Sequence, residues 1–302
     1  MGNTMSPWGD VMSAVKSILA VIGDSKSGRA CLHTALRVGR QLDCQVDALH
    51  VLADPMAALP LVGEAMSGAM VDEMMGVAER EAGQRAKLTR EMFNSVTAGI
   101  SQPPSPGAAN AFGVGWLEES GIEEQIVALR GCRADLIIVN RPTPENETAA
   151  LMTLNAALMQ SGRAVVAAPP LMSEDAEIPG PVERVAVFWN GSTEATRAVQ
   201  AAIPLLATAK EVTILRVEEE EWYAGTEDLN IHLTRHGVKT VISKVLPREI
   251  RTGRSLLFAA QDTGADMMVM GAYTRSKLRQ LMLGSVTGYV MEQAILPVLM
   301  CH

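Results

Sequence analysis

The sequence predicts an α/β protein with two doubly wound, parallel-sheet domains in tandem. The chain has 302 residues, enough for two domains that each bury a core of their own. Short apolar runs of strand length alternate with amphipathic helical segments, and the same order occurs twice. The two halves also match residue by residue, since residues 134–139 (ADLIIV) correspond to residues 265–270 (ADMMVM).

The first half begins with an apolar run at residues 18–22, which a Gly23-Asp24 turn follows. Its predicted strands cover residues 18–22, 46–51, 135–139 and 164–167. Its predicted helices cover residues 30–42, a long stretch between 54 and about 93, residues 119–132 and about 148–160. Residues 98–113 are rich in Pro, Gly, Ser and Ala, so they predict a loop.

The second half repeats this plan. Its predicted strands cover residues 185–188, 212–217, 239–245, 266–270 and 297–300. Its predicted helices cover residues 193–206, 229–236 and 255–263, and a last helix begins at Gly284-Ser285. Ser192 or Thr193 can cap the first of these helices. Strands that are apolar on both faces and alternate with helices indicate parallel sheets covered on both sides.

A domain boundary is expected in residues 173–183, because this segment is charged, contains prolines and lacks periodicity. The predicted domains are therefore residues 1–172 and 183–302.

Composition argues against two classes of partner. The net charge of −8 disfavours nucleic acid, whose phosphates bind to basic surfaces. No apolar run approaches the roughly 20 residues of a membrane helix, and residues 1–10 do not resemble a signal peptide. We therefore expect a cytoplasmic protein with no membrane partner.

The sulfur-containing and histidine side chains give no metal motif. The four cysteines form no CxxC pair, so free and mostly buried thiols are expected, and the 18 methionines suit an aliphatic core. His232 and His236 share one helix face and could hold a metal, but a solvated helix face is the favoured interpretation.

The candidate site lies after strand 266–270, since ligands of doubly wound sheets bind outside the carboxyl ends of the strands. Gly271 allows a tight turn there, with no side chain to obstruct a ligand. Gly284 and Ser285 begin the last helix, whose free N–H groups favour an anion. Arg275 and Lys277 offer positive charge. These features suit a phosphate, although the glycines could also be ordinary turns and helix caps.

Gly271, Gly284 and Ser285 resemble the motif of the nucleotide-binding universal stress proteins. That motif reads Gly, two residues, Gly, nine residues, then Gly and Ser or Thr. The spacing is intact here, with Thr274 where the second glycine is expected. The resemblance covers the whole chain as two copies and is strongest from residue 183 to residue 302. It implies two Rossmann-like domains of the adenine-nucleotide alpha-hydrolase type.

The resemblance also implies the other contacts of an adenine nucleotide. Asn190 stands where the family has an acidic residue after the first strand, so contact with base or ribose is favoured over metal coordination. Val217 matches the adenine-edge position, and Val286 and Thr287 continue the phosphate-binding end. The expected ligand is ATP or AMP, with or without Mg²⁺, and no catalytic or metal-binding residue is expected.

The implied function is a stress-response sensor or regulator that binds this nucleotide. Two alternatives remain open at this point: an enzyme of related fold with weak ATP hydrolysis or adenylation activity, and a tandem scaffold with no ligand. The sequence has no nucleophile elbow, P-loop lysine or clustered metal-binding residues, and this favours binding over catalysis.

The two halves are expected to pack as a pseudo-dimer through strands 164–167 and 297–300, because unpaired sheet edges seek partners. A homodimer of chains is a further option. When Ala164 is superposed on Pro297, the residues opposite Gly284, Ser285 and Thr287 are apolar and lie inside a predicted helix: Leu151, Met152 and Leu154. Residues 140–144 (NRPTP) replace the Gly271 turn. We therefore expect one nucleotide per chain, bound by the second half, while Gly23-Asp24 leaves room for a different small ligand in the first.

Overall fold

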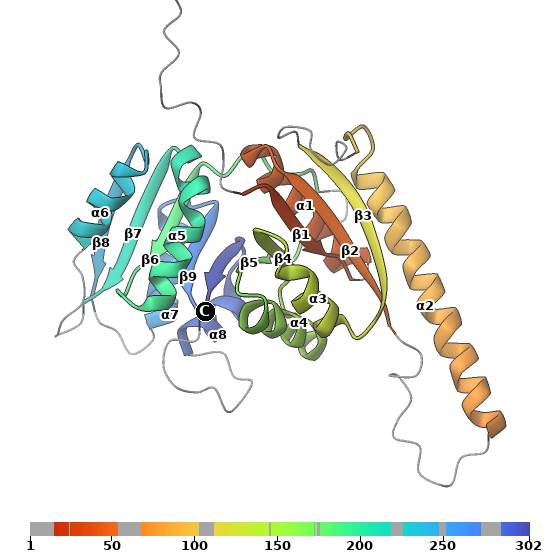
Figure 1. Ribbon diagram of the computed structural model, residues 1–302. Coiled ribbons are helices and arrows are strands. Elements are labelled where there is room, and N and C mark those ends of the chain that lie inside the picture. The colour runs from red at the N-terminus through yellow and green to blue at the C-terminus, as the bar shows by residue number, and fades with distance from the viewer. Residues whose placement is uncertain are drawn as a thin grey trace, which may run out of the picture.

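The computed structural model describes residues 15–23, 25–53, 68–102, 112–144, 146–171, 173, 176–218, 226–247, 252–272 and 285–302. The strands, in chain order, are β1 (Ser17–Val21), β2 (Gln45–Ala53), β3 (Gly113–Gly121), β4 (Leu136–Asn140), β5 (Ala164–Ala168), β6 (Arg184–Phe188), β7 (Glu211–Val217), β8 (Val241–Leu246), β9 (Met267–Gly271) and β10 (Val298–Cys301). They form one sheet in the order β3-β2-β1-β4-β5-β10-β9-β6-β7-β8 (Figure 1).

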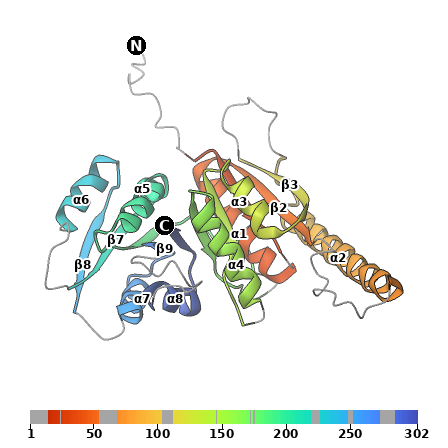
Figure 2. The same cartoon turned by 60° about the horizontal axis from the view of Figure 1, so that its bottom comes forward.

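Helices cover both faces of this sheet (Figures 1 and 2). They are α1 (Ser25–Leu42), α2 (Gly68–Val96), α3 (Glu123–Gly131), α4 (Glu147–Gln160), α5 (Thr193–Thr208), α6 (Thr226–Arg235), α7 (Thr252–Asp262) and α8 (Ser285–Gln293). One buried cluster joins the sheet to α1, α2, α5 and α6, and a second joins it to α3, α4, α7 and α8. The predicted α/β fold, with helices on both faces, is therefore confirmed.

The strand β3 corrects the sequence-based prediction. Residues 119–121 were expected in a helix, yet they are the end of β3, and α3 begins only at Glu123. Strand β3 lies at the edge of the sheet and pairs only with β2, so its second half tolerates polar, exposed residues. It therefore lacks the apolar run that marks the central strands. Gly113, expected in a loop, is its first residue.

The repeated Ala-Asp pair has the same structural role in both halves. Asp135 Oδ2 accepts hydrogen bonds from the backbone N–H groups of Lys16 and Ser17 at 2.8 and 3.0 Å. Asp266 Oδ2 accepts them from Glu183 and Arg184, both at 2.9 Å. Each aspartate thus satisfies donors where the first strand of its half begins.

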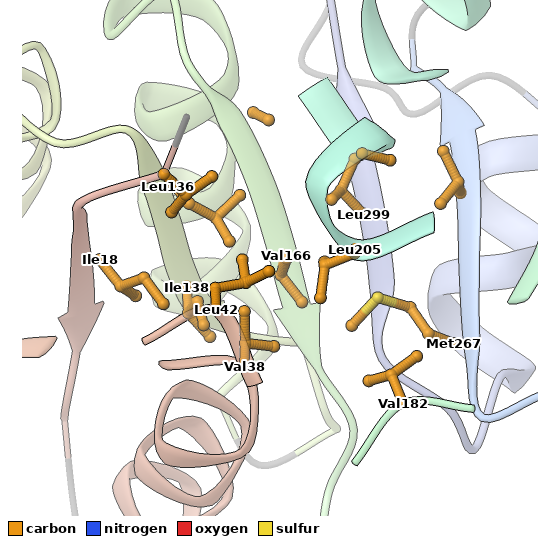
Figure 3. Close-up of a cluster of buried hydrophobic side chains, with 14 of the residues drawn as sticks. Ile18, Val38, Leu42, Leu136, Ile138, Val166, Val182, Leu205, Met267 and Leu299 are labelled. Carbon is orange, nitrogen blue, oxygen red and sulfur yellow. The ribbon is translucent and has the colours of Figure 1, made fainter. Parts of the chain in front are cut away.

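The last strands of the two halves pair with each other, as the sequence predicts. Strands β5 and β10 are antiparallel, with Leu299 opposite Val166, while every other neighbouring pair in the sheet is parallel. Figure 3 shows the consequence, since Ile138 and Val166 of the first half share one apolar cluster with Leu205 and Leu299 of the second. The core is continuous across the junction between the halves.

An arginine makes a second link between the halves. Arg37 lies on α1, and its guanidinium donates to the carbonyl oxygens of Gly180 at 2.6 Å, Pro181 at 3.1 Å and Asp266 at 3.3 Å. It also forms an ion pair with the Asp266 carboxylate at 3.4 Å. One side chain of the first half therefore joins the connecting segment to the start of β9.

Two further expectations concern thiols and membranes. All four cysteines are free, and Cys132 alone among them is exposed, as the sequence predicts. Burial raises the pKa of the Cys44 thiol to about 12, so it remains protonated at neutral pH. None of the helices in the described ranges combines the length and apolar composition that a membrane crossing requires.

Candidate functional site

The carboxyl ends of β6 and β9 form the switch point of the second half. These two strands are neighbours, and the helices that follow them cover opposite faces, because α5 packs in one buried cluster and α8 in the other. At such a point the connections diverge and leave room for a ligand. The first half has its own switch point at the ends of β1 and β4.

Asn190 shapes the turn between β6 and α5. Its Oδ1 accepts a hydrogen bond from the Ser192 N–H at 3.1 Å, and Gly191 between them has a φ of +69°. Ser192 then caps α5, because its hydroxyl accepts from the Ala195 N–H at 3.2 Å. Because the side-chain Oδ1 of Asn190 already accepts a hydrogen bond in this turn, the side-chain NH₂ of this exposed residue is the group that can reach a ligand.

Gly271 has a different role from the one expected. A Cβ at this position would lie 2.6 Å from the Ala195 nitrogen and 2.9 Å from Glu194 backbone and side-chain atoms. The space beside Gly271 thus belongs to the first turn of α5 rather than to a ligand. Close packing of α5 on β9 brings the Asn190 turn next to the end of β9.

We expect Gly271→Ala to destabilise the protein by about 1–3 kcal/mol, because α5 must move to admit the methyl group. Thermal and urea denaturation would measure the loss. Gly180→Ala is the matched control, since a Cβ there meets no atom within 4 Å. Equal stability of the two variants would contradict the packing role.

Val217 lies on the other side of β6, at the end of β7. The ladder between these strands ends where the Trp189 N–H donates to the Leu215 carbonyl at 2.9 Å. The backbone of Val217 therefore extends past the end of β6, where a ligand could meet it. On the far side of β7, the Glu218 N–H donates to the Leu246 carbonyl at 2.8 Å and closes that edge.

The described part of the last helix starts at Ser285, where the sequence predicts the helix to begin. Its first N–H groups have no partners within the helix, because an α-helix leaves its first four donors unpaired. Val286 is half-buried and Thr287 is buried. A Cβ on Gly253 of α7 would lie 3.3 Å from the Val286 carbonyl oxygen, so close contact with α7 holds the first turn of α8 in place.

Of the nine predicted site residues, Asn190 and Gly271 come together through the first turn of α5. Val217 lies on β7, the strand next to β6. Ser285, Val286 and Thr287 lie in the first turn of α8, which covers the face of the sheet opposite to α5. Thr274, Arg275 and Gly284 lie outside the described residues, as does Lys277.

The structure adds Glu194, which the sequence-based reasoning missed. This half-buried residue lies in the first turn of α5, against Gly271. It is an acidic residue whose Cβ lies close to the end of β9, at an edge where the strand β6 is followed by neutral Asn190. The only sequence signal was an acidic residue in a first helical turn, which ordinary helices also favour.

The corresponding edge of the first half is built differently. Asn140 takes the place of Gly271 at the end of its strand, and its Nδ2 lies 3.9 Å from where a Cβ of Gly23 would be. The loop from β4 to α4, residues 141–146, is about half as long as residues 272–284.

Helix α4 covers the positions on the N-terminal side of the one that matches Ser285. Both helices end on a glutamine, Gln160 in α4 and Gln293 in α8. Counting back from these ends, α4 begins more than one turn before the position of Ser285. The predicted placement of Leu151, Met152 and Leu154 inside a helix is confirmed.

Comparison with protein families gives one match. Residues 181–302 match the model of the universal stress protein family. No match to the chain is found among curated proteins.

Solved structures resemble the whole chain. A universal stress protein from Archaeoglobus fulgidus DSM 4304 has a TM-score of 0.60 and 16% identity, and the match covers 95% of this chain and 98% of that one. A putative universal stress protein from Pseudomonas aeruginosa UCBPP-PA14 has a TM-score of 0.53 and 14% identity, with 96% and 94% covered. The two-part architecture is therefore found in other proteins, and at these identities the likeness concerns the fold.

Proposed function

Because residues 181–302 match the model of the universal stress protein family, we propose that this half binds an adenine nucleotide, ATP or AMP. The nucleotide occupies the switch point of β6 and β9. The chain then acts as a sensor or regulator in the stress response, and binding or release of the nucleotide is the event to which it responds.

The observation that carries the proposal is the placement of three kinds of ligand-binding group at this edge. Free N–H groups begin α8 directly after Gly284 and suit a phosphate. The Asn190 amide suits the ribose or base, and the backbone of Val217 suits the adenine edge. Gly284 and Ser285 of the sequence motif support the same ligand.

Magnesium fits this site as a companion of the phosphates rather than as a protein-held ion. In the described part of the chain, no three His, Cys, Asp or Glu side chains gather to hold a metal. Glu194, whose Cβ lies close to Gly271, is the acidic residue available at the end of β9. Mg²⁺ commonly takes one or two carboxylates together with phosphate oxygens and waters, so one side chain suffices.

We propose that the first half binds no nucleotide. Asn140 lies over Gly23, the loop of residues 141–146 is short, and α4 extends past the position of Ser285. Each of these features removes space or free donors that a triphosphate would need.

The expected result is one nucleotide per chain. Protein purified from cells is denatured, and any released small molecule is identified by mass spectrometry. Calorimetric titration of ligand-free protein with ATP and with AMP should then give a stoichiometry near one. Two equivalent sites would contradict the assignment to the second half, and no binding of either nucleotide would contradict the function.

A further inference from the structure

Arg141 is a buried arginine that forms no ion pair with any of the described residues. It directly follows β4, its side chain is only 4% exposed, and its Nη1 is buried with no hydrogen-bond partner. The other buried arginine, Arg37, is matched by three carbonyl oxygens and a carboxylate.

The fold itself does not require an arginine at this position. Ala272 is the equivalent residue of the second half, and it is fully buried. Both residues make the same backbone hydrogen bond, from Arg141 to the Ala168 carbonyl at 3.3 Å and from Ala272 to the Cys301 carbonyl at 2.9 Å. A long cation therefore stands in the first half where the second half has a methyl group.

A buried guanidinium without a partner is costly, because it loses hydration and gains no attraction in return. Burial lowers the pKa of Arg141 to about 10, which still leaves the group protonated at neutral pH. A bound anion would remove the cost. Guanidinium groups bind carboxylates and phosphates through paired N–H donors.

The neighbouring residue also carries an unmatched polar atom. Asn140 Oδ1 is buried with no hydrogen-bond partner. An unsatisfied acceptor on Asn140 is therefore followed in the sequence by an unsatisfied donor, Nη1 of Arg141. Both residues lie at the switch point of β1 and β4, the place in a doubly wound sheet where ligands bind.

We propose that Arg141 binds the oxyanion group of a small metabolite at this switch point, as a second site distinct from the nucleotide site. The ligand is a compact phosphate or carboxylate compound rather than a nucleotide. Asn140 accepts a hydrogen bond from a hydroxyl or amine of the same compound.

The test follows thermal unfolding of the full chain during titration with inorganic phosphate or acetate, against chloride at equal ionic strength. We expect at least one of the two oxyanions to raise the Tm of the wild-type protein beyond the chloride effect. A larger effect of phosphate would point to a phosphorylated ligand, and a larger effect of acetate to a carboxylate ligand. No oxyanion-specific rise in the wild-type protein would overturn the proposal.

Variants separate this site from general salt effects and from the second half. Arg141→Met should unfold at a higher Tm than wild type without oxyanions, because it removes an uncompensated charge, and its apparent oxyanion affinity should fall at least tenfold. Arg141→Lys keeps the charge and should retain a weaker response. Arg133→Met, at an exposed arginine before the opposite end of β4, should respond like the wild type. An unchanged response in Arg141→Met or Arg141→Lys would overturn the proposal.

Discussion

Gly284→Asp is expected to abolish nucleotide binding while leaving the fold intact. Gly284 immediately precedes the first turn of α8, where unpaired N–H groups favour an anion. An aspartate there brings its own carboxylate to these donors and repels the phosphate. The dissociation constant for ATP should rise by at least about 100-fold, or about 2.7 kcal/mol. Calorimetric titration measures the change, and circular dichroism checks the fold.

Two variants calibrate this result. Ser285→Ala should cost about 1 kcal/mol, or about fivefold in affinity, since it removes one hydrogen bond among several. Met152→Asp introduces a carboxylate at the position of the first half that corresponds to Ser285. Met152 is exposed, so the change should be tolerated and nucleotide affinity should stay at the wild-type value. Unchanged affinity in folded Gly284→Asp would place the site elsewhere.

Much of the fold could be predicted from the sequence, because most strands are buried on both faces. After Asp135 and Asp266, the predicted strands 135–139 and 266–270 are continuous apolar runs, and each overlaps a central strand that is buried along most of its length. The edge strand β3 was missed for the converse physical reason. With one neighbouring strand and a partly exposed second half, it needs no apolar run, and the segment from Glu119 onward looked helical.

The candidate site was less predictable, because tertiary contacts decide what its residues do. The spacing of glycines pointed to Gly271, but only the structure shows that the Ala195 backbone needs the space. Glu194 reaches the site because α5 packs on β9, which no local pattern reveals. Arg141 looked like an ordinary loop residue, and only its burial without a partner distinguishes it.

The link through Arg37 leads to the second large effect, on stability. Arg37 is 8% exposed and Asp266 is 33% exposed, so the pair is largely shielded from water. Burial lowers the pKa of Arg37, and Asp266 opposes that shift. Asp266 also accepts the backbone hydrogen bonds that begin β6. Loss of Arg37 would therefore remove a donor from three carbonyl oxygens and weaken the start of the second half.

We expect Arg37→Met to lower the free energy of unfolding by about 2–4 kcal/mol. The substitution leaves the shielded hydrogen-bond acceptors and the Asp266 carboxylate without their cationic donor, while methionine replaces the apolar part of the arginine side chain. Urea denaturation of the full chain measures the loss. Lys210→Met is the matched control, since it breaks the 2.6 Å pair of a 70% exposed lysine with Glu183 and should cost at most about 1 kcal/mol. If the two variants lost equal stability, the halves would not depend on each other through Arg37. A larger loss in Arg37→Met, with both halves unfolding earlier, would mean that the first half helps to hold the nucleotide-binding half in its folded form.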